Sequence, residues 1–163
     1  MGPTEVNGLP AHVLLVHFVV IMIPITALLL VLSAVWPAAR ARIGVVLPIV
    51  ALASLISVPL TVHAGEWLKG KMGGGGPLVE RHEELAEMLL PWAIGLFVMS
   101  VAVWAVHRFV LATRAGNSRS LLTVGLAVLA VVVAVGSVFT VYRAGDSGAK
   151  AAWDGVVKTA SSQ

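Results

Sequence analysis

The stretch that decides the fold is residues 14–36, LLVHFVVIMIPITALLLVLSAVW, an apolar run that contains no Asp, Glu, Lys or Arg. A helix needs about 20 such residues to cross the roughly 30 Å hydrocarbon layer of a bilayer. Three further apolar runs without these charged residues follow, at residues 43–62, 89–106 and 121–142. The sequence therefore predicts four membrane-spanning helices.

The composition of the chain is that of a membrane protein. Of its 163 residues, 58% are hydrophobic and only 12% are charged, which is too little polar surface for a water-soluble globule. The first run is longer than the apolar core of a cleavable signal peptide, and no Lys or Arg precedes it, so we expect it to stay in the mature protein. The absence of cysteine excludes disulfides, thiolate-bound zinc and iron–sulfur clusters held by the chain.

Short connections join the four runs, and short connections make neighbouring helices antiparallel. We predict an all-α fold, a transmembrane up-down four-helix bundle in which residues 1–163 form a single integral membrane domain. The expected elements are helices at about 12–36, 43–66, 80–107 and 121–143 and an outer-face tail at 144–163.

The basic residues predict the orientation of this bundle. The first and third connections carry basic residues and no acid, namely Arg40, Arg42, Arg108, Arg114 and Arg119. By the positive-inside rule these connections face the cytoplasm, so that both termini are extracytoplasmic. Because the basic residues flank helices, lipid headgroups are their expected partner, and nucleic acid is not.

Histidines gather at the outer ends of the predicted helices. His12 and His17 open the first helix, His63 closes the second, and His82 precedes the third. Neutral imidazole is the commonest protein ligand for transition metals and is a ligand of haem iron. His12 and His17 are about 140° apart around a helix, so they point to different partners; the deeper His17 is the better candidate for the bundle interior.

Two interpretations of these histidines stay open from the residues alone. Imidazoles at a membrane interface also act as headgroup anchors or as hydrogen-bond partners of a nearby carboxylate. Glu66 follows His63 by three residues and shares its helix face. Serines in the apolar runs have no adjacent His and carboxylate, so we expect no hydrolytic or other independent catalytic activity.

At these residues the chain resembles a known family. The stretch from His12 to Phe18 resembles the opening of the bacterial membrane family called domain of unknown function 2231 (DUF2231). Ala64-Gly65-Glu66, His82-Glu83 and the segment 145–149 are similar to further motifs of that family, although Asp146 stands where the family has a histidine. The resemblance implies a bacterial inner (plasma) membrane, and some family members look fused to Rieske modules, which implies redox partners.

Three functions follow as hypotheses. The first is a b-type haem protein that binds haem b through a pair drawn from His17, His63 and His82, with Arg81 and Lys71 near the propionates. It would exchange electrons with quinol or a redox partner at the outer face. The second is a zinc, copper or iron ion held by His17, His63, Glu66 and His82. The third is a non-catalytic accessory subunit of a larger, respiratory membrane complex or a homo-oligomer, in which these residues only set packing.

Overall fold

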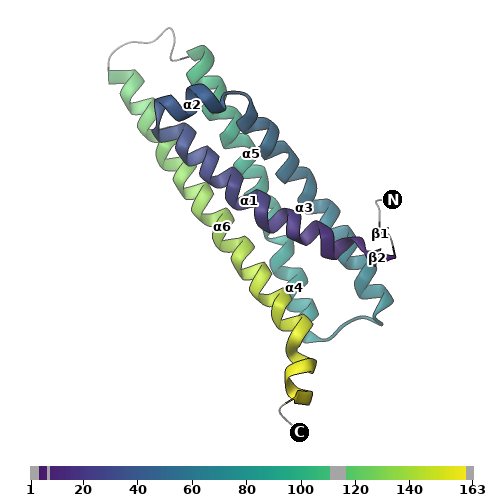
Figure 1. Cartoon of the computed structure of the whole chain (residues 1–163). Helices are drawn as coiled ribbons and strands as arrows, with labels where there is room; N and C mark the ends of the chain where they lie inside the picture. The colour runs from purple at the N-terminus through teal and green to yellow at the C-terminus, as the bar shows by residue number, and fades with distance from the viewer. Residues whose placement is uncertain (1–3, 7, 111–116, 161–163) are drawn as a thin grey trace.

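The computed structural model describes residues 4–6, 8–110 and 117–160, which are almost entirely helical (Figure 1). Two short strands, β1 and β2, pair antiparallel ahead of the first helix. The elements in chain order are β1 (Glu5–Val6), β2 (Leu9–Pro10), α1 (Ala11–Val35), α2 (Pro37–Ile43), α3 (Val46–Lys71), α4 (Pro77–Glu87), α5 (Leu89–Ala105), the π-helix η1 (Val106–Val110) and α6 (Asn117–Ala160).

The structure confirms the all-α four-helix bundle and its four candidate spans. Among the described residues, the helical segments that are long and apolar enough to cross a membrane are Ala11–Val35, Val46–Lys71, Pro77–Val110 and Ser120–Trp153. The chain is a small multi-pass membrane protein.

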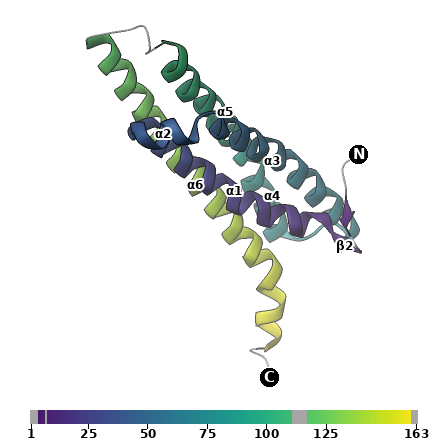
Figure 2. The same ribbon diagram turned by 45° about the horizontal axis from the view of Figure 1, so that its top comes forward.

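The helices are arranged so that α1 and α5 are diagonal partners. α3 and α6 each pack against both α1 and α5, and α4 packs mainly against α6. Figures 1 and 2 place the β1–β2 hairpin, α4 and the C-terminal part of α6 at one end, which we call the histidine end. The opposite end, which holds α2 and η1, is called the α2 end.

Prolines set two of the helix boundaries. Trp36 is extended, with φ −117° and ψ 108°, because a residue that precedes proline is disfavoured in the helical region. α1 therefore ends, and Pro37 opens α2 at a position where its missing N–H costs nothing. Pro91 has no N–H to donate to the carbonyl oxygen of Glu87. α4 ends at Glu87, and α5 begins at Leu89.

The last helix is longer than the sequence predicted. The predicted helix ends at residue 143 and gives way to a tail, whereas α6 continues to Ala160. Ala144 and Ser147 are buried where α6 packs on α4, and Lys150 pairs with Asp146 one turn earlier at 2.7 Å. Packing of this turn outweighs the low helix propensity of its glycines.

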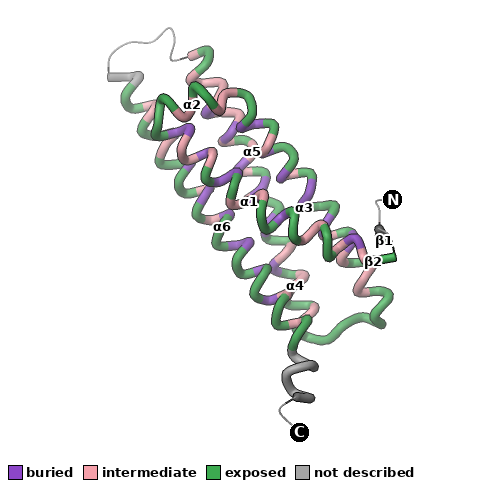
Figure 3. The backbone as a smooth tube through the Cα atoms, in the orientation of Figure 1, coloured by how far each residue is buried: buried purple, intermediate pink, exposed green. Residues whose placement is uncertain are grey.

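The core is a seam of apolar and small polar residues along the inner faces of the helices (Figure 3). Ile23, Leu30 and Leu96 are fully buried. The hydroxyls of Thr26 on α1 and Ser54 on α3 hydrogen-bond across the seam at 2.8 Å. Such interhelical hydrogen bonds and small residues let membrane helices pack without a hydrophobic driving force. Large apolar side chains cover the outer faces instead, as expected for lipid contact.

Close contact of α5 and α6 depends on Gly136, where a Cβ would overlap the ring of Trp92. We expect Gly136→Ala to lower the free energy of unfolding by about 1–3 kcal/mol, the usual cost of overpacking. The matched control is Gly125→Ala on the same helix, where a Cβ meets nothing within 4 Å and should not destabilise. Thermal unfolding of the three proteins in detergent measures the difference, and equal midpoints for both variants would contradict the packing.

Candidate functional site

Two histidines from diagonal parts of the bundle meet at the histidine end. His12 lies in the first turn of α1, and His82 lies on α4. Their ring centroids are 6.2 Å apart and their planes are inclined by 76°. Both side chains are partly buried. Among the described residues this is the only contact between two imidazole rings, and we call it the histidine pair.

Each ring of the histidine pair is held by a backbone carbonyl of a neighbouring helix. His12 Nδ1 lies 3.0 Å from the carbonyl oxygen of Thr61 on α3. His82 Nδ1 lies 3.0 Å from the carbonyl oxygen of Ala144 on α6 and 3.1 Å from Ser147 Oγ. The Ser147 hydroxyl donates to Ala144 O at 2.8 Å, so its oxygen accepts from His82.

These hydrogen bonds fix the tautomer of both rings. A carbonyl oxygen only accepts, so Nδ1 of His12 and Nδ1 of His82 must carry the hydrogen. In the neutral rings Nε2 then holds the lone pair. A ring whose Nδ1–H donates to a carbonyl is the usual arrangement of a metal-binding histidine.

Glycines on the two flanking helices make room for the imidazoles. A Cβ at Gly65 on α3 would lie 3.0 Å from Nδ1 and Cε1 of His12, and a Cβ at Gly148 on α6 would lie 3.0 Å from Cε1 of His82. Those distances are too short for an ordinary van der Waals contact. Any larger residue at Gly65 or Gly148 would displace a ring of the histidine pair.

The histidines predicted to accompany His82 lie elsewhere. His17 is exposed on α1, and its Nδ1 donates to the Val13 carbonyl of its own helix at 2.6 Å. His63 is also exposed and lies 3.7 Å from Glu66, as their spacing predicted. Within the described part of the chain, no group of three or more His, Asp or Glu side chains could hold one metal ion.

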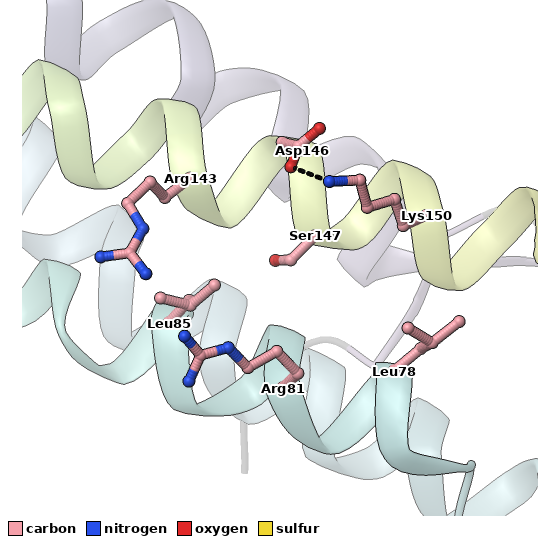
Figure 4. Close-up of a pocket in the computed structure, with 7 residues that line it drawn as sticks. All are labelled: Leu78, Arg81, Leu85, Arg143, Asp146, Ser147 and Lys150. Carbon is pink, nitrogen blue, oxygen red and sulfur yellow. Dashed lines mark hydrogen bonds and ion pairs between the residues drawn. The ribbon is translucent and has the colours of Figure 1, made fainter.

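Arg81 lines a shallow groove beside the pair, between α4 and α6, with a volume of about 200 Å³. In Figure 4 its guanidinium and that of Arg143 lie on the same side of the groove, near Leu85. Arg81 is ion-paired with Glu84 at 3.0 Å, and Lys150 with Asp146. Lys71, predicted near the propionates, lies with its Nζ 5.4 Å from the Trp67 ring centre.

An ion pair fixes α4 beside α3. Lys69 Nζ donates to Glu83 at 2.6 Å, and both side chains are about 30% exposed (27% and 32%). Glu83 is the neighbour of His82 in the chain. The Lys69–Glu83 ion pair closes the loop that contains Gly73, Gly74 and Gly75, all with positive φ. The loop therefore returns the chain so that α4 presents His82 to α1.

The sequence interpretation undervalued His12, Gly65, Ser147 and Gly148. Two signals were present: the 140° separation directs His12 and His17 to different partners, and Gly65 and Gly148 belong to the short motifs already quoted. Sequence alone could not say which histidine faces inward, because that depends on the rotation of α1 against α3.

Comparison with known proteins does not assign the chain to a family. No family model, no curated protein and no solved structure matches the chain.

The tautomer of the histidine pair is directly measurable. In protein without cofactor, labelled at histidine with ¹⁵N and kept above pH 8, we expect the Nε2 signals of His12 and His82 to be those of unprotonated nitrogen, because Nδ1 carries the hydrogen. His12→Ala and His82→Ala assign the signals. A protonated Nε2 on either ring would contradict the hydrogen bonds to Thr61 and Ala144.

Proposed function

We propose that the protein is a small membrane electron-transfer protein that binds haem b between His12 and His82. The observation that supports this most strongly is the histidine pair itself: two imidazoles from diagonal helices, each with Nδ1 engaged by a backbone carbonyl. Two neutral imidazoles on facing helices of a bundle are a known way to hold haem iron.

The spacing of the rings is compatible with ligation from opposite sides. A metal–imidazole bond is about 2.0–2.1 Å long, so rings on opposite sides of one metal have centroids roughly 6 Å apart. The centroids of His12 and His82 are 6.2 Å apart. The same distance and the 76° inclination also occur in an edge-to-face ring contact. The cofactor assignment therefore rests on the Nδ1–H groups, which donate to the carbonyls of Thr61 and Ala144 and leave the lone pair of each ring on Nε2.

The residues around the pair would each have a defined task. The Thr61 and Ala144 carbonyls orient the rings and raise the basicity of Nε2, and Ser147 adds a second acceptor for His82. Gly65 and Gly148 keep the ring positions clear of side chains. Arg81 and Arg143 bring positive charge to the rim of the site, where propionates would be neutralised. When bound, the haem supplies one-electron transfer.

The position of the pair also limits the reaction. The pair lies at one end of the bundle, and a helix as long as α1 spans about 37 Å, which is a membrane thickness. One haem there cannot by itself carry electrons across the bilayer. We therefore propose exchange with quinol or a redox protein on the same face.

The location follows from charge and from the resemblance of the sequence. We propose a bacterial inner membrane, both termini extracytoplasmic, and membership of the DUF2231 family. In support, η1 and α2 carry Arg40, Arg42 and Arg108, and no acid occurs in either element. The histidine end carries the acids, with Glu66, Glu83 and Asp146 among them.

A transition-metal ion is the second candidate, and one observation favours it. The backbones of α3 and α6 approach the two rings closely at Gly65 and Gly148, so the pair is compact enough for a bare ion completed by water. Zinc, copper and iron are all compatible with imidazole ligands. If neither haem nor ion binds, the pair is a packing contact and the chain is better explained as an accessory subunit.

The absorption spectrum of protein purified from cells supplied with haem precursors tests the proposal. We expect a Soret band with sharp α and β bands on reduction, and loss of at least about 90% of bound haem in His12→Ala and in His82→Ala, since one remaining imidazole binds iron far more weakly. Metal analysis of the same samples identifies a bare ion instead.

His17→Ala and His63→Ala are the matched controls. Both remove an exposed imidazole from the same end of the bundle, and both should retain the cofactor. A colourless, metal-free wild-type protein would contradict the proposal. Cofactor loss in His17→Ala or His63→Ala, with retention in His12→Ala, would return the ligand role to the residues first predicted from the sequence.

A further inference from the structure

α4, which carries one ring of the histidine pair, is attached to the bundle through few buried side chains. Five of its eleven residues are Glu or Arg, and among these eleven, all of which the structure describes, Leu85 alone is buried. The next helix, α5, buries five residues. α4 also precedes the apolar run at residues 89–106. A change in its position therefore does not bring charged side chains into hydrocarbon.

Both ends of α4 are suited to act as hinges. The loop before it contains glycines at 73–75 with φ of 79°, 106° and 69°, and glycine changes between such conformations at little cost. At its other end α4 passes into α5 at Met88, where Pro91 offers no N–H to the carbonyl oxygen of Glu87. Hinges in proteins are typically a few loop or helix-end residues of this kind.

Polar contacts at two successive residues hold α4 in its present position. Glu83 accepts a hydrogen bond from Lys69 Nζ on α3 at 2.6 Å, and we call this ion pair the latch. His82 donates from Nδ1 to the carbonyl oxygen of Ala144 on α6 at 3.0 Å. The latch is partly exposed, and exposed ion pairs contribute little to stability. It can therefore favour the closed position without preventing opening.

The closed bundle leaves little space beside the histidine pair. The backbones of α3 and α6 lie against the rings, since a Cβ at Gly65 or Gly148 would be 3.0 Å from them. The groove between α4 and α6 has a volume of about 200 Å³, whereas pockets for small-molecule ligands and cofactors measure about 300–1,000 Å³. A macrocycle between the rings therefore requires one ring to move. His12 belongs to α1, which buries residues along its whole length, so the movable ring is that of His82.

We propose that α4 is a gate over the histidine pair, which turns about the glycines at 73–75 and about Met88, carries His82 away from α1 and so admits the cofactor. Closure restores the hydrogen bonds of His82 and forms the latch. The purpose of this gate rests on the proposed haem function, whereas the opening of α4 does not. A bare metal ion would need no such opening.

Hydrogen exchange followed by mass spectrometry tests the opening, in full-length protein without cofactor in bilayer discs. A separate helix of eleven residues is marginal in water, so α4 loses backbone hydrogen bonds and exchanges when it leaves the bundle. Lys69→Gln removes the latch. We expect it to speed the exchange of α4 about two- to fivefold, the effect of one partly exposed ion pair, while α5 exchanges as in the wild type.

Lys71→Gln is the matched control. Lys71 lies two residues further along α3, and its Nζ lies over the Trp67 ring, so its loss should leave the exchange of α4 unchanged. Exchange of α4 as slow in Lys69→Gln as in the wild type would overturn the proposal. An equal acceleration in Lys69→Gln and Lys71→Gln would also overturn it.

A reversible cross-link tests whether α4 controls cofactor entry. The chain has no cysteine, so Lys69→Cys with Glu83→Cys supplies the only thiols for a bis-methanethiosulfonate linker, which a reductant removes. We expect the linked protein to take up added haem at least about tenfold more slowly, because opening then limits the rate, and to recover after reduction. Asp146→Cys with Lys150→Cys, one turn apart on α6, is the control, and its linker should not slow uptake.

Uptake at the same rate with and without the Lys69–Glu83 linker would contradict the gate. A wild-type protein that takes up no haem and shows no Soret band would instead refute the haem function, and with it the purpose of the gate. In that case hydrogen exchange still decides whether α4 opens, so the two failures are distinguishable.

Discussion

Every crossing of the hydrocarbon layer has to satisfy its own backbone hydrogen bonds, and this constraint determines where chemistry can occur in the chain. Lipid offers no partner for an N–H or C=O, so each apolar run must be helical. Ionisable side chains are then confined to the helix ends. Because the chain crosses four times, residues far apart in sequence arrive at the same end, and His12 meets His82 although 70 positions separate them.

Small residues convert this arrangement into a defined site. Gly65 and Gly148 let α3 and α6 approach the imidazoles, and the same close approach brings the Thr61 and Ala144 carbonyls within hydrogen-bond distance. The flanking helices thus orient rings that belong to α1 and α4. Gly136 likewise leaves room for the ring of Trp92, which packs against α6 there. Stability and the geometry of the pair therefore rest on the same kind of contact.

The two ends of the bundle differ in charge. The histidine end carries acids and bases in ion pairs, such as Lys69 with Glu83, around the proposed redox site. The α2 end has basic residues, and neither α2 nor η1 contains an acid. If that end faces the cytoplasm, its arginines lie in the leaflet surface where anionic lipids are found.

Much of the fold was predictable because apolar length is a strong signal, and the four spans were found where expected. The end of α6 was not predictable, because the glycines at 145 and 148 favour a helix break, whereas packing on α4 keeps the segment helical. In the candidate site, the proximity of His63 and Glu66 followed from helical spacing, and the ligand role predicted for His82 stays a prediction. The candidate site contains His12 where the sequence analysis named His17. Which of the two faces the bundle depends on the rotation of α1 about its axis, and α1 has apolar residues all round, so no amphipathic face indicates that rotation.

The contact between the rings of His12 and His82 is the claim on which the account depends. The chain has five histidines, so solid-state NMR of histidine-labelled protein in bilayers gives a spectrum simple enough to assign with single alanine variants. We predict a through-space cross-peak between the ring carbons of His12 and His82, whose centroids are 6.2 Å apart. A cross-peak from His82 to His17 or His63, with none to His12, would contradict the account.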